Sequence, residues 1–117
     1  MKTFNRATGR LAEDLATEAL VKKGYLILQK NFSNRFGEID IIAQDKNIYV
    51  FVEVKAKKGE EFGLPEEMIT PSKLSKIRHM ATVYLNGENV PCRIDVVAIV
   101  LTPDNDLIRL THYENVV

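Results

Sequence analysis

Charged side chains interrupt two neighbouring hydrophobic segments of the sequence. Asp40 lies in the segment Phe36–Ala43, and Glu53 and Lys55 lie in the segment Ile48–Lys55. Both segments have the composition of β-strands, and along a strand Glu53 and Lys55 project from the same face. Charged groups beside a central strand lose hydration at a large free-energy cost unless partners or a metal ion compensate. We therefore treat the three residues as candidates for metal binding and catalysis.

The turn between the two segments decides whether these side chains meet. A two-residue loop at positions 46 and 47 would set the antiparallel register. The predicted pairs are then Asp45 with Ile48, Asp40 with Glu53, and Glu38 with Lys55. Directly opposed Cβ atoms lie roughly 4.5–5.5 Å apart, so two carboxylates would repel unless one is protonated or both bind a cation. A divalent metal ion would resolve this conflict.

The available ligands indicate which metal would bind. Oxygen ligands without a histidine or cysteine cluster favour Mg²⁺ or Mn²⁺ over zinc. Such an ion can polarise a phosphate and activate water, while Lys55 can orient that water or offset developing charge. The backbone carbonyl of Val54 is a further candidate ligand. The alternative, a charged pair on a solvated sheet face, is weakened by the apolar neighbours Ile39, Ile41 and Val52, which indicate burial.

Hydrophobic periodicity predicts two helices and five strands around these residues. Gly24 is a stop signal for the first helix, and Thr70 and Pro71 are typical of the N-cap and first turn of the second. The expected elements are helix Thr8–Lys23, strands Tyr25–Phe32, Phe36–Ala43 and Ile48–Lys55, helix Pro71–Gly87, and strands Arg93–Leu101 and Leu107–His112.

The connections between these elements predict the topology. Short links favour an antiparallel meander of the first three strands, and passage through the second helix favours a fourth strand parallel to the third. The stretch Lys58–Pro65 has glycine, proline and charges without periodicity, so we expect a mobile loop. The fold class is therefore α/β, with a mixed sheet flanked by helices. A chain of 117 residues suits one domain, residues 1–117.

Composition and charge bound the setting of the protein. The chain has no apolar run of about 18 residues and no signal-peptide pattern, so we expect a cytoplasmic protein with no membrane partner. The lone Cys92 cannot form an internal disulfide, which agrees with a reducing compartment. The balance of 16 basic and 16 acidic residues provides no global attraction to nucleic acid.

The motifs resemble those of the PD-(D/E)XK nuclease superfamily, and more closely those of the small bacterial YraN-like family. Asp40 within Gly37–Ala43 and the Glu53-Val54-Lys55 tripeptide carry the superfamily pattern. The YraN-like resemblance extends over most of the chain. Its motifs are Gly9–Glu13, Gly24–Leu28, Phe62–Gly63, Thr70–Lys73 and Arg93–Val97.

The resemblance implies a fold, a set of roles and an activity. It implies a restriction endonuclease-like αβββαβ core, here with a C-terminal strand, in an architecture that archaeal Holliday junction resolvases share. By motif position, Asp40 and Glu53 would be catalytic residues that bind the metal, and Lys55 would be the catalytic lysine. Glu13 would be the acidic residue of the first helix, with both a catalytic and a metal-binding role. The implied activity is Mg²⁺- or Mn²⁺-dependent endonucleolytic hydrolysis of DNA, with branched or structured DNA as a candidate substrate.

The sequence is also compatible with two other functions. One is a catalytically weak or inactive nucleic-acid-binding module of a repair, recombination or uptake complex, and the other is a protein-interaction domain with a vestigial metal site. Resolvase activity would require a homodimer to cut two strands. Candidate contacts to nucleic acid are the basic residues Lys57, Lys58, Lys73, Lys76 and Arg78.

Three further polar residues have less specific expectations. Asp95 would either support Lys55 from the neighbouring parallel strand or lie at the surface where its strand begins. His79 and His112 are each expected to be surface residues.

Overall fold

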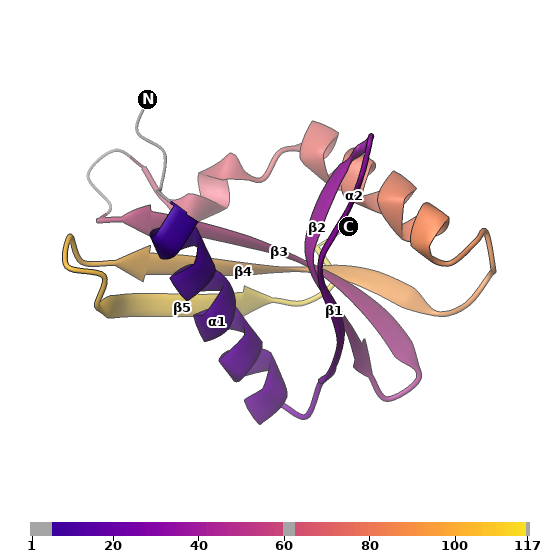
Figure 1. Ribbon diagram of the computed structural model, residues 1–117, viewed down its shortest axis with the longest axis horizontal. Coiled ribbons are helices and arrows are strands. Elements are labelled where there is room, and N and C mark those ends of the chain that lie inside the picture. Colours follow the sequence, from indigo (N-terminus) through magenta and orange to yellow (C-terminus); the bar gives the residue numbers. More distant parts are fainter. Residues whose placement is uncertain (1–5, 60–62, 117) are drawn as a thin grey trace.

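The computed structural model describes residues 6–59 and 63–116, which form a five-stranded mixed sheet with helices on both faces (Figure 1). The strands lie in the order β1-β2-β3-β4-β5. The elements are α1 Arg6–Lys22, β1 Leu26–Asn34, β2 Gly37–Asp45, β3 Ile48–Lys58, a 3₁₀ helix η1 Pro65–Met68, α2 Pro71–Tyr84, β4 Cys92–Leu101 and β5 Leu107–Tyr113. No helix of the described segments is long and apolar enough to cross a membrane.

The expected topology is confirmed. The first three strands are antiparallel neighbours, β4 is parallel to β3, and β5 returns antiparallel to β4. This arrangement is the α/β fold with an αβββαβ order and an added C-terminal strand. Part of the expected loop Lys58–Pro65, residues 60–62, lies outside the described residues. At its ends, Lys58 still belongs to β3, because pairing with β4 continues to Leu101, and Pro65 begins η1.

Each face of the sheet has its own hydrophobic core. The small residues Ala12 and Ala16 let α1 approach one face closely, and Leu20 extends this contact. On the other face, α2 buries Ile77, Met80 and other residues against the sheet. The strand residues of the α1 face include Ile41, Ala43, Val50, Val52, Val97, Ile99 and Leu101, and those of the α2 face include Ile39, Ile42, Phe51 and Ile94.

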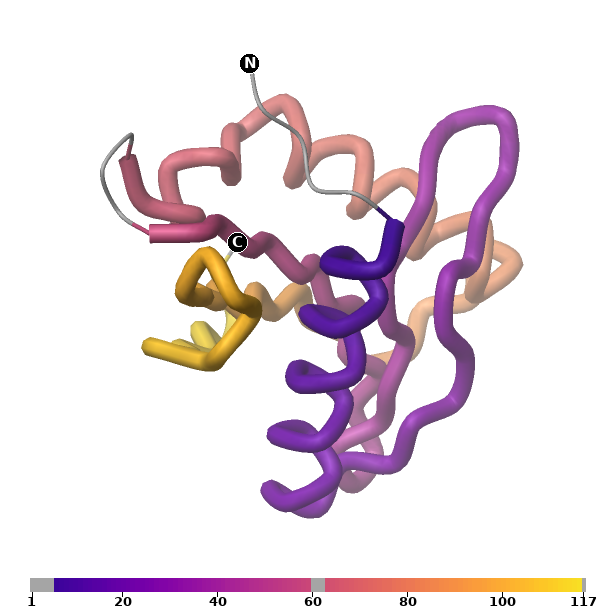
Figure 2. The backbone as a smooth tube through the Cα atoms, turned by 60° about the vertical axis from the view of Figure 1, so that its left-hand side comes forward, coloured from indigo at the N-terminus to yellow at the C-terminus, as the bar shows by residue number. Residues whose placement is uncertain are grey.

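The β1–β2 hairpin bends away from the rest of the sheet (Figure 2). Its tip packs on α2, where the rings of Phe36 and His79 meet edge to face at 4.8 Å. Ile39 contributes to the α2 core with Ile42, although strict alternation from Ile42 would place Ile39 on the α1 side. Ile39 and Ile41 therefore belong to different cores, although alternation along a strand predicts one shared face, because the bend carries the tip of the hairpin towards α2.

Candidate functional site

The candidate site lies where β2 and β3 separate. The predicted pair Asp45–Ile48 is confirmed, but the backbone pairing of the two strands stops at Ile41 and Val52. The pairs Asp40–Glu53 and Glu38–Lys55 are therefore not formed in the β-ladder, because the hairpin bends towards α2 at this point.

The Asp40 side chain bridges the gap that the bend leaves. Its Oδ2 accepts a hydrogen bond of 2.8 Å from the backbone N–H of Val54, a donor that a regular ladder would have paired with backbone. This contact holds the Asp40 carboxyl beside β3, and the Glu53 carboxyl also lies close enough to interact with it. The two acidic residues thus meet through side chains rather than through a strand pair.

The two carboxyl groups are electrostatically opposed. Glu53 is buried, with 3% of its surface exposed. Burial, followed by the negative charge of Glu53, raises the pKa of Asp40 to about 8. Without a cation, Asp40 is therefore mainly protonated at neutral pH. A bound cation would allow both groups to ionise.

Two lysines surround Glu53. Lys55 Nζ lies 3.4 Å from Glu53 Oε2, and Lys73 Nζ lies 3.1 Å from the same oxygen. Burial lowers the pKa of Lys55, and contact with Lys73 adds to that effect. Lys55 comes from β3, whereas Lys73 reaches the site from the first turn of α2. The structure thus brings together Asp40, Glu53 and Lys55 as expected, and adds Lys73 to them.

Glu13 lines a pocket that Asp40 and Lys55 also line, but its hydrogen-bond partner is Asn31. Its Oε1 accepts a hydrogen bond of 3.1 Å from Asn31 Nδ2, and burial raises its pKa. The pocket has a volume of about 670 Å³ and is bordered by α1, β2, β3 and η1; among its lining residues are Glu13, Glu38, Asp40, Val54, Lys55 and Met68. Within residues 6–59 and 63–116, no three acidic, histidine or cysteine residues converge closely enough to hold a metal ion.

A divalent ion fits the donors that are present. Asp40 and Glu53 offer carboxylate oxygens, and Mg²⁺ usually binds through one or two carboxylates while keeping several waters. The cost of ionising Asp40 beside Glu53 is what a doubly charged ion would offset. The neighbouring pocket is large enough for a phosphate group with its waters. Glu13 contacts Asn31 rather than this pair, so two carboxylates are the set that fits.

The other predicted basic residues lie at the end of β3 and on exposed positions of α2. Lys58 lies at the end of β3, where its Nζ is 3.5 Å from the carbonyl oxygen of Pro103. Lys57 precedes it on β3, and Lys76 and Arg78 are exposed on α2. Sequence reasoning missed two cations of α1 that line the pocket, Arg6 and Arg10. The signal available in the sequence was their spacing of four residues, which places both on one face of the helix, with Arg10 three residues before Glu13.

Asp95 contradicts both of its expected roles. In the parallel ladder Val52 pairs with Asp95 and Glu53 with Val96, so Asp95 and Glu53 project from opposite faces of the sheet. Asp95 therefore cannot support Lys55, and with 0% of its surface exposed it is not a surface residue. Its neighbours lie on the α1 side of the sheet.

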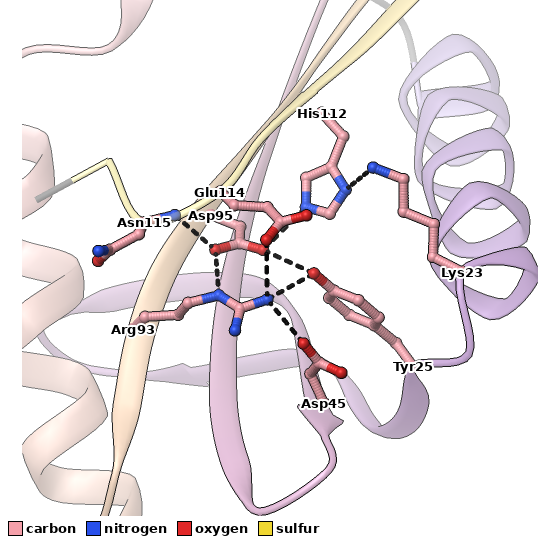
Figure 3. A network of polar contacts seen from close by, with 8 residues as sticks. All are labelled: Lys23, Tyr25, Asp45, Arg93, Asp95, His112, Glu114 and Asn115. Atoms are coloured by element: carbon pink, nitrogen blue, oxygen red, sulfur yellow. Dashed lines mark hydrogen bonds and ion pairs between the residues drawn. The ribbon is translucent and has the colours of Figure 1, made fainter.

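The Asp95 carboxylate is the centre of a polar network (Figure 3). It interacts with Arg93 Nε at 3.0 Å, His112 Nε2 at 2.8 Å, the backbone N–H of Asn115 at 3.0 Å and Tyr25 Oη at 3.4 Å. The prediction of a surface role is wrong for His112, whose side chain is 2% exposed, because β5 places it against Asp95. The other histidine, His79, is exposed on α2 as expected.

Arg93 connects this network to two more acidic residues. Its guanidinium contacts Asp45 at 3.2 Å and Glu114 at 3.7 Å, and it also donates to the Tyr25 hydroxyl. Lys23, at the end of the α1 region, reaches the second ring nitrogen of His112 at 2.8 Å. The sequence signal for such a buried network was the pair of charged residues, Arg93 and Asp95, in a strand that is otherwise apolar.

Comparison with known proteins assigns the chain to a family. The family described as "Uncharacterised protein family UPF0102" matches residues 12–99. A UPF0102 protein of Pelotomaculum thermopropionicum is 40% identical over 118 residues, covering 98% of each chain. One of Caldanaerobacter subterraneus subsp. tengcongensis is 42% identical over 120 residues, again covering 98% of each. The chain therefore belongs to the UPF0102 family, which is the YraN-like family that its motifs resemble.

Proposed function

We propose that the protein is a divalent-metal-dependent endonuclease that hydrolyses DNA phosphodiesters, with branched or structured DNA as a candidate substrate. The observation that carries the proposal is the opposed Asp40–Glu53 pair, with Lys55 Nζ 3.4 Å from Glu53, beside an open pocket of about 670 Å³. A buried pair of carboxylates next to an ammonium group suits a site for a divalent cation and a phosphate.

Each residue then has a distinct role. Asp40 and Glu53 would hold Mg²⁺ or Mn²⁺, which supplies polarisation of the phosphate and activation of a water molecule. Lys55 donates to the attacking water or to a phosphate oxygen and offsets the negative charge that develops as water adds to phosphorus. As the water oxygen bonds to phosphorus, one P–O ester bond breaks, the water loses a proton to solvent, and the leaving alkoxide takes up a proton from solvent. The hydrogen bond from Val54 fixes the Asp40 carboxyl, so the site is preorganised on the strand.

The basic residues of the pocket suggest how the substrate would be positioned. Arg6 and Arg10 of α1 line the pocket together with Val54 and Lys55 of β3. Guanidinium groups bind phosphates without reading the base sequence. Their location supports binding of a nucleic-acid backbone across the pocket. The two positive charges compensate locally for the absence of net positive charge on the chain.

A cleavage panel tests this function. Single-stranded, duplex, flap and four-way DNA would be incubated with Mg²⁺ or Mn²⁺ and the full chain. We expect cleavage of at least one substrate, and a loss of about 100-fold or more in Glu53→Ala and Lys55→Ala proteins that remain folded. Asp104→Ala, an exposed change in the β4–β5 turn, should retain wild-type activity.

The same panel distinguishes the main alternative. DNA binding that is unchanged in the Glu53→Ala and Lys55→Ala proteins, with no cleavage of any substrate, would reject the nuclease in favour of a binding module. Absence of both metal binding and DNA binding would reject both functions.

A further inference from the structure

Lys73 occupies a position that its own helix does not favour. It lies in the first turn of α2, where Thr70 Oγ1 accepts a hydrogen bond of 3.2 Å from the Lys73 backbone N–H. Cations near the start of a helix are disfavoured by the helix dipole, and the first turn of α2 contains no acidic residue to compensate. The reason for a lysine here therefore lies outside the helix.

The contact that explains it is with Glu53. Lys73 and Lys55 both approach the same carboxylate oxygen, Oε2, at 3.1 Å and 3.4 Å. The side chain of Glu53 is 4% exposed, so its charge needs a nearby cation. The Lys55 side chain is 20% exposed and that of Lys73 is 38% exposed. Lys73 is thus the more solvent-accessible of two cations that share one buried oxygen.

A divalent metal ion would compete with this arrangement. An ion held by Asp40 and Glu53 would lie within a few ångströms of two ammonium groups, and like charges at that distance repel strongly outside bulk water. Lys55 is constrained by its position on β3, two residues after Glu53. Lys73 has an exposed four-carbon stem that can turn into solvent or towards an anion. Of the two lysines, Lys73 can leave more readily.

We propose that Lys73 is a displaceable counter-ion of the site. It neutralises Glu53 in the metal-free protein, is released when a divalent ion binds, and then contacts a phosphate of the nucleic-acid substrate. This inference rests on the proposed nuclease function for the identity of the metal site and the substrate. It adds an order of events, in which metal binding frees a phosphate-binding cation, so that DNA binds more tightly once the metal is present.

Manganese titration of the full-length chain tests the first step. Isothermal calorimetry would compare wild type with Lys73→Gln and with Lys22→Gln, which removes an exposed lysine at the far end of α1. We expect Lys73→Gln to bind Mn²⁺ about five- to tenfold more tightly, because the competing charge is absent. Lys22→Gln should stay within about twofold of wild type, as expected for a distant surface charge.

Oligonucleotide binding tests the second step. Fluorescence anisotropy with a phosphorothioate-linked single strand, which resists hydrolysis, would be measured with Mn²⁺ and again with EDTA. We expect Lys73→Gln to weaken binding about three- to tenfold with Mn²⁺ and much less with EDTA, because in EDTA the ammonium remains on Glu53. An equal loss under both conditions would overturn the proposed release.

The outcomes separate this inference from the function on which it rests. If wild type binds Mn²⁺ and Lys73→Gln binds it equally well or more weakly, the counter-ion role is overturned and the proposed nuclease function is unaffected. Tighter Mn²⁺ binding in Lys73→Gln, without cleavage of any DNA in the panel, supports the counter-ion and rejects the nuclease. Failure of both proteins to bind Mn²⁺ overturns both proposals.

Discussion

Carboxylates are buried on both faces of the β3–β4 pair, and their negative charge is balanced in a different way on each face. On the α1 face, Asp95 is fully buried and interacts with Arg93, His112, Tyr25 and a backbone N–H. On the opposite face of this strand pair, the buried carboxyl of Glu53 is opposed by the carboxyl of Asp40, which has one backbone donor. A buried charge that has protein donors on both oxygens needs no further ligand, whereas two opposed carboxyls leave a place for an external cation.

The pKa values of Asp95 and Asp40 shift in opposite directions, in agreement with this difference between the two sites. Burial would raise the pKa of Asp95, but hydrogen bonds from His112, Asn115 and Arg93 outweigh it and hold the pKa below its ordinary value. At Asp40, burial and the Glu53 charge act together and outweigh the Val54 N–H. The Asp95 network therefore stabilises the fold at neutral pH, and the Asp40–Glu53 pair destabilises it until a cation binds.

Removal of the central carboxylate of the network should have the largest effect on stability. In Asp95→Ala, Arg93 and His112 lose a buried partner, so we expect the free energy of unfolding to fall by about 3–5 kcal/mol. Urea denaturation at pH 7 measures it. Asp104→Ala, at an exposed position, should change stability by less than about 0.5 kcal/mol. Similar losses in the two variants would show that the network contributes little.

The opposite sign is expected at the candidate metal site. Asp40→Asn removes the acidic group but retains an oxygen that can accept from the Val54 N–H. Without metal, we expect the variant to be more stable than wild type by about 1–3 kcal/mol at pH 8. Thermal unfolding in EDTA measures this gain, with Asp104→Asn at an exposed position of the β4–β5 turn as the control.

The pH dependence sharpens this comparison. The folded-state pKa of Asp40 is raised from 3.8 to about 8, so the folded protein retains a proton that the unfolded chain has lost. Wild-type stability should therefore fall as pH rises between these two values, and the advantage of Asp40→Asn should grow over the same interval and level off above it. An advantage that is constant with pH would contradict the electrostatic cause. Mn²⁺ should stabilise wild type more than Asp40→Asn.

The smallest effect is expected at η1, which leads the chain from the pocket towards α2. Glu66 accepts hydrogen bonds from Arg109 at 2.8 Å and from Tyr113 at 2.6 Å, and the Arg109 contact is the main cause that lowers the pKa of Glu66 to about 2. Because the groups are partly exposed, Glu66→Gln should cost only about 0.5–1 kcal/mol at pH 7.

Acid should remove the contribution of Glu66. The lowered pKa means that its stabilisation is present above 4.5, the ordinary value, and is lost as pH falls towards 2. Urea denaturation at pH 7 and pH 3 should therefore give a smaller difference between wild type and Glu66→Gln at the lower pH. An equal difference at both values would indicate a loss of packing rather than of charge.

Local patterns in the sequence determined much of the framework of the site. The turn after Asp45 set the β2–β3 register near Ile48, and Thr70 and Pro71 marked the start of α2. The period-two pattern of β3 placed Glu53 and Lys55 on one face, where the structure has them. These features depend on residues close together in the chain, so the sequence alone was sufficient to predict them.

The tertiary structure decided how those residues are used. The hairpin bends towards α2, where Phe36 packs on His79, and Asp40 therefore meets β3 through its side chain instead of a ladder pair. The same long-range packing brings Lys73 of α2 to Glu53 and His112 of β5 to Asp95. Local periodicity describes which residues share a face, but it contains no information about which distant side chains cover that face.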